Sequence, residues 1–219
     1  MKNILIFGSG GHASVVIDIA QQEKKYTIIG IIDEPKNTNE ISGLPILSNI
    51  STLKKLIIEE DIFGGVIAIG DNAIRAKVRD QILLEVPHFQ FVNCIHPNAV
   101  VASNVLMGEG NVMMAGSIVN PNCQISNHCI MNTKSSLDHD CKMLNFSSIA
   151  PNVTVGGNCK IGQYSAIGIG ANIIHNISIG VNCIVGSGSL VTKNIKDNLV
   201  YYGVPAKFIR SHEFGDSYL

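Results

Sequence analysis

The second half of the chain repeats with a period of six residues. Stepping by six from Ile95 to Val191 gives seventeen positions, and each is Ile, Leu, Val or Met. Two places before these positions the residue is usually small, and Gly often follows them. Self-similarity at a fixed short period is typical of a solenoid whose repeats stack on one another. The pattern predicts a parallel β-helix over residues 95–191, with three hexapeptides in each triangular coil.

Five of the six cysteines fall in the small-residue phase of this repeat. Zinc sites instead use cysteine pairs only a few residues apart that converge on one ion. Cysteines that differ by multiples of six stack along one inward row, as small buried thiols. We therefore expect neither a disulfide nor a metal site from Cys123, Cys129, Cys141, Cys159 and Cys183.

Residues 1–92 have a different rhythm, in which apolar runs alternate with amphipathic segments. Strands alternating with helices indicate a parallel sheet with helices on both faces. We therefore expect a truncated Rossmann-like α/β domain over residues 1–92, followed by the all-β domain over 93–219, which ends in a short tail. The predicted strands are 3–11, 26–34 and 64–72, and the predicted helices are 12–22, 50–60 (with Ser51 or Thr52 as N-cap) and 73–86.

Composition excludes several classes of function. The net charge is −1, which favours neither a nucleic-acid groove nor a polybasic membrane patch. The first apolar run breaks into glycines too early for a secretory signal, and no run reaches the ~18 residues of a membrane span. We expect a cytoplasmic protein.

The loop from Gly8 to Ala13 reads GSGGHA and fits a G-x-G-x-x-A pattern between a strand and a helix. Backbone N–H groups at a helix N-terminus bind phosphate, and Asp33, after the second strand, suits a ribose hydroxyl. Taken alone, the pattern would indicate NAD, but no second mononucleotide-binding half follows. The alternative is that the glycines serve only a tight strand-to-helix turn.

Several motifs together resemble one bacterial family: the GSGGHA loop, AIGDNAIR at 68–75, NTKSSLDHDC at 132–141, GSGSLVTKNI at 186–195 and YYGVPAKFIR at 201–210. It is the family of sugar acyltransferases that includes nucleotide-linked amino-sugar N-acetyltransferases and sialic acid O-acetyltransferases. The resemblance covers nearly the whole chain. It implies a left-handed β-helix, a homotrimer, acetyl-CoA as donor, and active sites between neighbouring subunits.

The resemblance also implies roles for a histidine and the carboxylate that follows it. His139 would be the general base, and Asp140 would hold its imidazole in one tautomer and raise its basicity. Asp138 is expected to be a surface or turn residue. Alternatively, His139 is a solvated surface histidine, as we expect His96, His128 and His175 to be.

The substrates are placed by the same resemblance. The sugar nucleotide is expected at Gly10, Gly11, His12, Asp33, Glu34 and Gly70. The pantetheine arm of acetyl-CoA is expected along Ser148, Ile169 and Ser187, although position 148 is commonly a histidine in the family.

Three functions remain open from the sequence. The leading one is acetyl-CoA-dependent N-acetylation of a nucleotide-linked amino sugar, such as a UDP-4-amino-4,6-dideoxy sugar, for surface glycan biosynthesis. The others are O-acetylation of a sialic-acid-type sugar by the same base, and a non-catalytic trimer that binds sugar nucleotides. In every case, outward apolar residues at Ile118, Ile130 and Ile174 favour a partner subunit.

Overall fold

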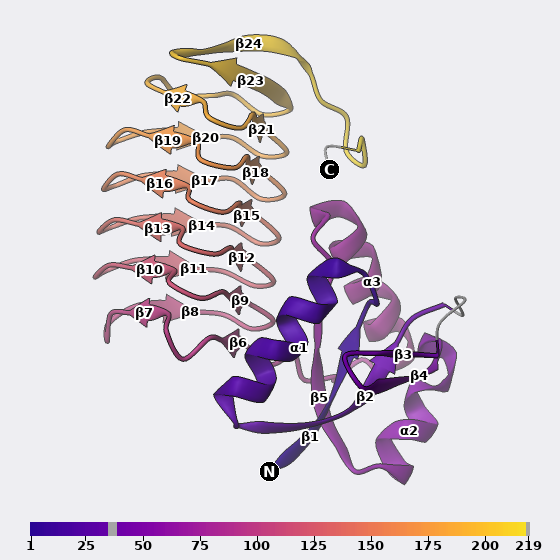
Figure 1. Cartoon of the computed structure of the whole chain (residues 1–219). Coiled ribbons are helices and arrows are strands. Elements are labelled where there is room, and N and C mark those ends of the chain that lie inside the picture. Colours follow the sequence, from indigo (N-terminus) through magenta and orange to yellow (C-terminus); the bar gives the residue numbers. More distant parts are fainter. Residues whose placement is uncertain (35–38, 218–219) are drawn as a thin grey trace.

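The computed structural model describes residues 1–34 and 39–217, which form an α/β region and a long coil of parallel strands beside it (Figure 1). The sheet of the α/β region has the strand order β3-β4-β2-β1-β5, in which only β3 runs antiparallel to its neighbour. Its elements are β1 (Lys2–Phe7), α1 (Gly11–Glu23), β2 (Tyr26–Ile32), β3 (Glu40–Ile41), β4 (Leu44–Ser48), a 3-10 turn (Ile50–Thr52), α2 (Leu53–Glu59), β5 (Ile62–Ile67) and α3 (Asn72–Glu85).

Helices cover both faces of this sheet. Along β1, Ile4 and Ile6 pack toward α1, while Leu5 and Phe7 pack toward α2 and α3. Successive side chains of a strand point to opposite faces, so a strand buried on both sides reads as a continuous apolar run. The three predicted strands and three predicted helices are present, within a few residues of their expected ends.

Two local details add to the predicted elements. The short hairpin of β3 and β4 was not predicted. Thr52, one of the two predicted N-cap residues, stands at the N-cap of α2 but makes no side-chain capping hydrogen bond, whereas Asn49 caps the preceding 3-10 turn by accepting the backbone N–H of Ser51. Ser51 and Thr52 belong to the 3-10 turn, and α2 begins at Leu53.

The coil has three faces, and from β6 to β22 each strand pairs in parallel with the equivalent strand of the next turn, eighteen residues away. Face 1 lies beside the α/β region and ends in an antiparallel hairpin (Figure 1). Face 1 contains β6 (Cys94–Ile95), β9 (Val112–Met113), β12 (Ile130–Met131), β15 (Ser148–Ile149), β18 (Ala166–Ile167), β21 (Ile184–Val185), β23 (Leu199–Gly203) and β24 (Ala206–Ser211). Face 2 contains β7 (Val100–Val101), β10 (Ile118–Val119), β13 (Ser136–Leu137), β16 (Thr154–Val155), β19 (Asn172–Ile173) and β22 (Leu190–Val191). Face 3 contains β8 (Leu106–Met107), β11 (Gln124–Ile125), β14 (Lys142–Met143), β17 (Lys160–Ile161) and β20 (Ser178–Ile179).

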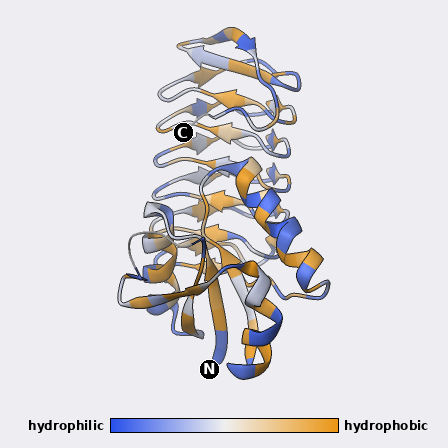
Figure 2. Cartoon of the chain, turned by 90° about the vertical axis from the view of Figure 1, so that its right-hand side faces the viewer, coloured by the Kyte–Doolittle hydropathy of each residue, from blue (hydrophilic) through white to orange (hydrophobic). Residues whose placement is uncertain are grey.

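The six-residue repeat fills the interior of the coil, as predicted. Every large apolar position of the repeat from Met113 to Val191 is buried, whereas the first three, in the first coil, are only half-buried. The five cysteines of the small-residue phase are also buried and free, with at most 3% of any of them exposed. Apolar strand segments run through both regions, while polar residues cover the outward sides of the helices (Figure 2). Among the described residues, no helix is long and apolar enough to cross a membrane.

The corners of the coil use left-handed backbone conformations. At the corner between faces 2 and 3, one residue per coil has a φ of 57–63°, and these residues are Asn122, Asp140, Asn158 and Asn176. Asn and Asp tolerate this conformation better than other non-glycine residues do. An aspartate at position 140 therefore keeps the turn that asparagine makes in three neighbouring coils.

The α/β region covers the first coils of face 1. Ile130 is 3% exposed, because it belongs to the apolar cluster shared with α1. The expectation that Ile130 faces a partner subunit is therefore wrong, while Ile118 and Ile174 are exposed at 40% and 39%.

Two histidines expected to be solvated are buried at or near this junction. His96 is 7% exposed, and His128 is 1% exposed, with its ring stacked on Phe146 at 4.9 Å. His128, Phe146 and Tyr164 occupy one corner position in successive coils, so their rings form a column that meets Phe91 of the α/β region. Burial of His128 lowers its pKa to about 3, which keeps the ring neutral inside this column.

Candidate functional site

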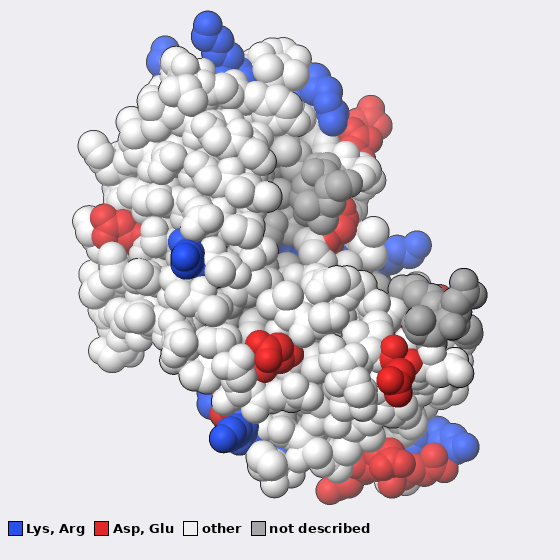
Figure 3. All heavy atoms as spheres, viewed as in Figure 1, with Lys and Arg blue, Asp and Glu red and all other residues white. Residues whose placement is uncertain are grey.

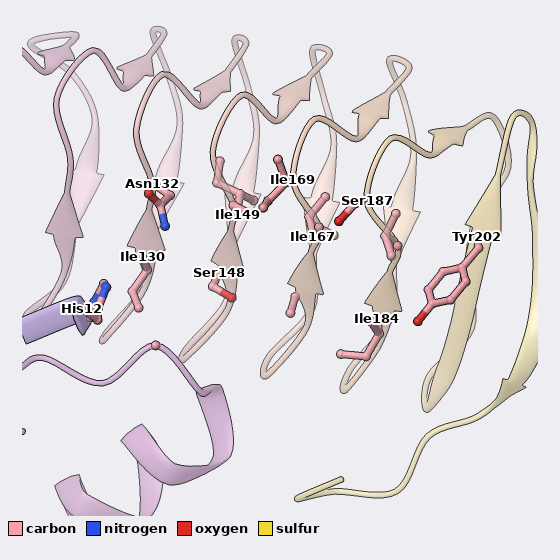
Figure 4. Close-up of a pocket in the computed structure, with 16 residues that line it drawn as sticks. His12, Ile130, Asn132, Ser148, Ile149, Ile167, Ile169, Ile184, Ser187 and Tyr202 are labelled. Carbon is pink, nitrogen blue, oxygen red and sulfur yellow. The ribbon is translucent and has the colours of Figure 1, made fainter. Parts of the chain in front are cut away.

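A pocket of about 600 Å³ runs along the outer side of face 1. One end is formed by His12 and Gly70 of the α/β region, and the other end reaches Tyr202 in the final hairpin (Figure 4). Its floor consists of side chains from successive strands, so it is long, narrow and mostly apolar. The residues of the coil that line it are Ile130, Asn132, Ser148, Ile149, Ala150, Ala166, Ile167, Gly168, Ile169, Ile184, Val185, Gly186, Ser187 and Tyr202.

This pocket brings together residues expected to bind two different substrates. His12 and Gly70 were expected at the sugar nucleotide, and Ser148, Ile169 and Ser187 at the pantetheine arm. The structure places both groups in one continuous cavity. Sequence reasoning missed Asn132 and Tyr202, although both lie within motifs that carry the family resemblance.

His12 has unusual electrostatics at the α/β end of the pocket. Its Nε2 atom is buried and has no hydrogen-bond partner. Burial, and then the positive charge of Arg75, lower the pKa of His12 to about 4. The imidazole is therefore neutral near pH 7, and its unpartnered nitrogen is available to a ligand.

The glycine loop next to His12 contains glycines of two kinds. Gly8 has a φ of 110°, and a Cβ there would lie 2.8 Å from Ile69, so the turn itself requires this glycine. A Cβ on Gly10 or Gly11 would meet nothing within 4 Å, and neither residue has a positive φ. Packing and backbone conformation therefore do not require glycine at positions 10 and 11, which leave the N-terminus of α1 open to a ligand.

The acidic residues after β2 lie next to this loop. The Ser9 hydroxyl donates a hydrogen bond to one carboxylate oxygen of Asp33, and the backbone N–H of Glu34 donates to the other at 2.7 Å. Gly10, Gly11, Asp33 and Glu34 thus form a polar rim beside the pocket and are not among its lining residues.

His139 and Asp140 form a pair at the corner between faces 2 and 3. Nδ1 of His139 lies 2.7 Å from a carboxylate oxygen of Asp140, and both side chains are about half exposed. A carboxylate can only accept a hydrogen bond, so Nδ1 carries the proton and Nε2 keeps its lone pair. This hydrogen bond, together with the negative charge of Asp138, raises the pKa of His139, and the same bond lowers the pKa of Asp140.

Two neighbouring residues, Asp138 and Gly157, determine the turn and the space in which this pair lies. Asp138 accepts the backbone N–H of His139 at 2.9 Å and the amide of Asn120 at 2.9 Å, so it shapes the turn, as expected. Gly157 lies one coil further along at the same corner position. A Cβ on Gly157 would come within 2.7 Å of both Cε1 and Nε2 of His139, so the imidazole occupies space that only a glycine leaves open.

The pair and the pocket occupy different parts of the coil. The pocket follows the outer side of face 1, whereas His139 lies between β13 of face 2 and β14 of face 3. Neither His139 nor Asp140 lines the pocket. In the part of the chain that the structure describes, no cluster of three or more His, Cys, Asp or Glu side chains could hold a metal ion.

Comparisons with known proteins give a consistent picture. Residues 3–82 match the model of the PglD N-terminal domain family. Over 120 residues the chain is 32% identical to the UDP-N-acetylbacillosamine N-acetyltransferase of Bacillus subtilis, and this stretch covers 52% of each protein. The chain thus spans about half the length of that curated relative.

Solved structures are similar over almost the whole chain. The GDP-perosamine N-acetyltransferase of Caulobacter crescentus, in complex with CoA and GDP-perosamine, superposes with a TM-score of 0.90 and 33% identity, covering 96% of this chain and 98% of that one. In two of its structures a histidine is replaced, by Ala in one and by Asn in the other. The acetyltransferase domain of PglB from Neisseria gonorrhoeae, with acetyl coenzyme A, gives a TM-score of 0.88 and 29% identity, covering 95% of this chain and 99% of that one.

A parallel coil, an α/β region of the PglD type and end-to-end similarity to an enzyme with bound CoA and nucleotide sugar lead to one assignment: the chain belongs to the family of nucleotide-linked amino-sugar N-acetyltransferases.

Proposed function

We propose that this protein transfers the acetyl group of acetyl-CoA to the amino group of a nucleotide-linked amino sugar, in the biosynthesis of a surface glycan. The observation that carries the proposal is the end-to-end similarity to an enzyme whose structure holds CoA and GDP-perosamine. The amino sugar of that relative also favours N-acetylation over the O-acetylation of a sialic-acid-type sugar. The His139–Asp140 pair argues against a protein that only binds sugar nucleotides.

In the proposed reaction, His139 is the general base. The amine nitrogen attacks the thioester carbonyl, the carbon–sulfur bond breaks, and Nε2 of His139 takes the proton that the amine loses. The imidazolium then returns a proton to the departing CoA thiolate. Asp140, bound to Nδ1, stabilises the imidazolium that forms between these steps.

We place the nucleotide of the acceptor at the glycine loop and the donor along face 1. Backbone N–H groups at Gly10 and Gly11 would meet phosphate, with Asp33 and Glu34 at the polar rim. The pantetheine arm would follow Ser148, Ile169 and Ser187 toward the hairpin. Lys and Arg side chains gather at that far end of the molecule, where they suit the CoA phosphates (Figure 3).

We infer a homotrimer in which His139 of one copy faces the pocket of the next. The base and the pocket lie on different sides of the coil within one chain, so a second copy is needed to bring them together. Exposed apolar side chains at Ile118 and Ile174, and a largely uncharged coil surface in Figure 3, suit such contacts. In this reading residues 1–92 act as a truncated Rossmann-like acceptor domain and residues 93–219 as a left-handed β-helical catalytic domain; residues 218 and 219 lie outside the described range.

The first test is a substrate screen with a matched variant. Purified protein is incubated with acetyl-CoA and UDP-, GDP- or dTDP-linked amino sugars, or with sialic acids, and release of the CoA thiol is followed. We expect turnover of an amino sugar, and His139→Ala should lower kcat by about 10²- to 10⁴-fold with little change in KM for acetyl-CoA. Turnover restricted to a sialic acid would support O-acetylation, and undiminished kcat in the variant would remove His139 as the base.

The second prediction concerns pH. Asp140→Asn should preserve the turn, since Asn holds the same corner position in three other coils. Loss of the carboxylate should lower the pKa of His139, which Asp140 raises. Because the base works in its neutral form, the rising limb of the kcat profile should move to lower pH. The plateau value of kcat should also fall, by less than in His139→Ala. If the rising limb stays at the same pH, a group other than His139 controls it.

The third prediction concerns the space above the imidazole. Gly157→Ala should displace the ring of His139 while leaving the coil folded, since the added methyl meets side-chain atoms and the backbone φ is not positive. We expect kcat to fall by about tenfold or more, because small displacements of a catalytic group are costly. In a His139→Ala background the same substitution should have no further effect. An equal loss in both backgrounds would indicate general damage to the coil.

The fourth prediction separates a shared site from a site within one chain. His139→Ala lacks the base, and Ser148→Trp fills the pocket, so each homotrimer should be inactive. When the two chains are co-expressed in equal amounts, about a quarter of the sites should combine an intact base with an intact pocket from the neighbouring copy. Activity near that level supports the shared site. No recovery in mixed assemblies, checked by mass and by two affinity tags, would place both groups in one chain.

A further inference from the structure

Arg75 lies where the α/β region meets the coil, and it is 1% exposed. It belongs to the first turn of α3, directly after the loop that contains Gly70. A buried guanidinium is costly unless each of its N–H groups finds an acceptor, so its contacts show what it organises.

The guanidinium donates hydrogen bonds in two directions. Toward the α/β region, Nη1 donates to the backbone carbonyls of Ile69 and Gly70, each at 2.9 Å. Toward the coil, Nε donates to the carbonyl of His128 at 2.9 Å, and Nη2 donates to the carbonyl of Phe146 at 3.0 Å. One planar group thus joins a loop of the first region to two corners of the second.

The residues whose carbonyls accept these hydrogen bonds line the pocket or lie close in sequence to residues that do. Gly70 is itself a lining residue. His128 and Phe146 stand two residues before Ile130 and Ser148, which are lining residues on the opposite wall. The guanidinium therefore contacts backbone beside both walls at the end of the pocket where the acceptor is placed.

We propose that Arg75 is a positioning residue that sets the width of the acceptor end of the pocket, by holding the Gly70 loop at a fixed distance from β12 and β15. The inference rests on the proposed function, because it assigns that end to the nucleotide sugar. The donor end at Ser187 and Tyr202 lies about two coils further along face 1, beyond the reach of these hydrogen bonds.

Lysine is the informative replacement for Arg75. It keeps a positive charge but lacks the planar fork that reaches four carbonyls at once. In Arg75→Lys we expect KM for the nucleotide sugar to rise by about tenfold or more, and KM for acetyl-CoA to change by less than about twofold. Asn72→Ala removes a side-chain acceptor of the same guanidinium, at 2.6 Å, and should shift KM for the nucleotide sugar in the same direction by a smaller factor.

Ile82→Ala is the matched control. Ile82 is a buried residue of the same helix that packs into the sheet and has no hydrogen bond to the guanidinium. It should lower thermal stability and leave both KM values unchanged. Similar KM changes in the control, or equal changes for both substrates in Arg75→Lys, would overturn the proposal in favour of a general loss of stability.

Amide hydrogen exchange provides a readout that does not depend on turnover. In Arg75→Lys, peptides covering residues 66–72 should exchange about tenfold faster than in the wild type, and more than in Ile82→Ala. Unchanged exchange would overturn the role of Arg75 whether or not the enzyme is active, and failure of Arg75→Lys to fold would do so too, by making Arg75 a requirement of the fold. Absence of wild-type turnover with every sugar nucleotide would instead count against the proposed function.

Discussion

Parallel pairing between residues eighteen apart organises the coil and, through it, the corner that holds His139 and the floor of the pocket. Each backbone strand is hydrogen-bonded to the coil before and the coil after, so a residue type at one corner is stacked on its counterparts above and below. The column that contains His139 and Gly157 and the column that contains His128 and Phe146 both arise in this way. One column leaves room for an exposed imidazole, and the other builds the junction with the α/β region.

Two histidines at corners of the coil have pKa values shifted in opposite directions, because their surroundings differ. His128 is enclosed by aromatic rings and Arg75, so its pKa falls to about 3 and it stays neutral. His139 is exposed and bound to a carboxylate, so its pKa is raised. The environment at each corner, more than the residue type, decides whether the pKa of a histidine is lowered by packing or raised by a neighbouring carboxylate.

Much of the fold was predictable because the coil is periodic. The six-residue phase located the inward row from Met113 to Val191 and the buried cysteines. The alternation of strand and helix located β1, β2, β5 and the three helices of the α/β region, but not β3 and β4. The burial of His128 and Ile130 was not predicted. The repeat predicts which side chains point into the coil, but it does not predict which outward side chains are covered by the α/β region. A period of eighteen in the aromatic residues at 128, 146 and 164 was a signal that could have been used. That these residues share one cavity needed the structure, since His12 and Gly70 come from the α/β region and the other lining residues from the coil.

The pocket has a consequence for how such proteins can vary in length. Because its floor is made of strands from successive turns, a shift of a strand by one residue would turn its inward-facing side chains outward. A change of eighteen residues preserves all three faces and moves the hairpin that carries Tyr202 by one strand spacing, about 4.8 Å. Adding or removing one complete turn therefore lengthens or shortens the cavity by one strand spacing without disturbing its lining.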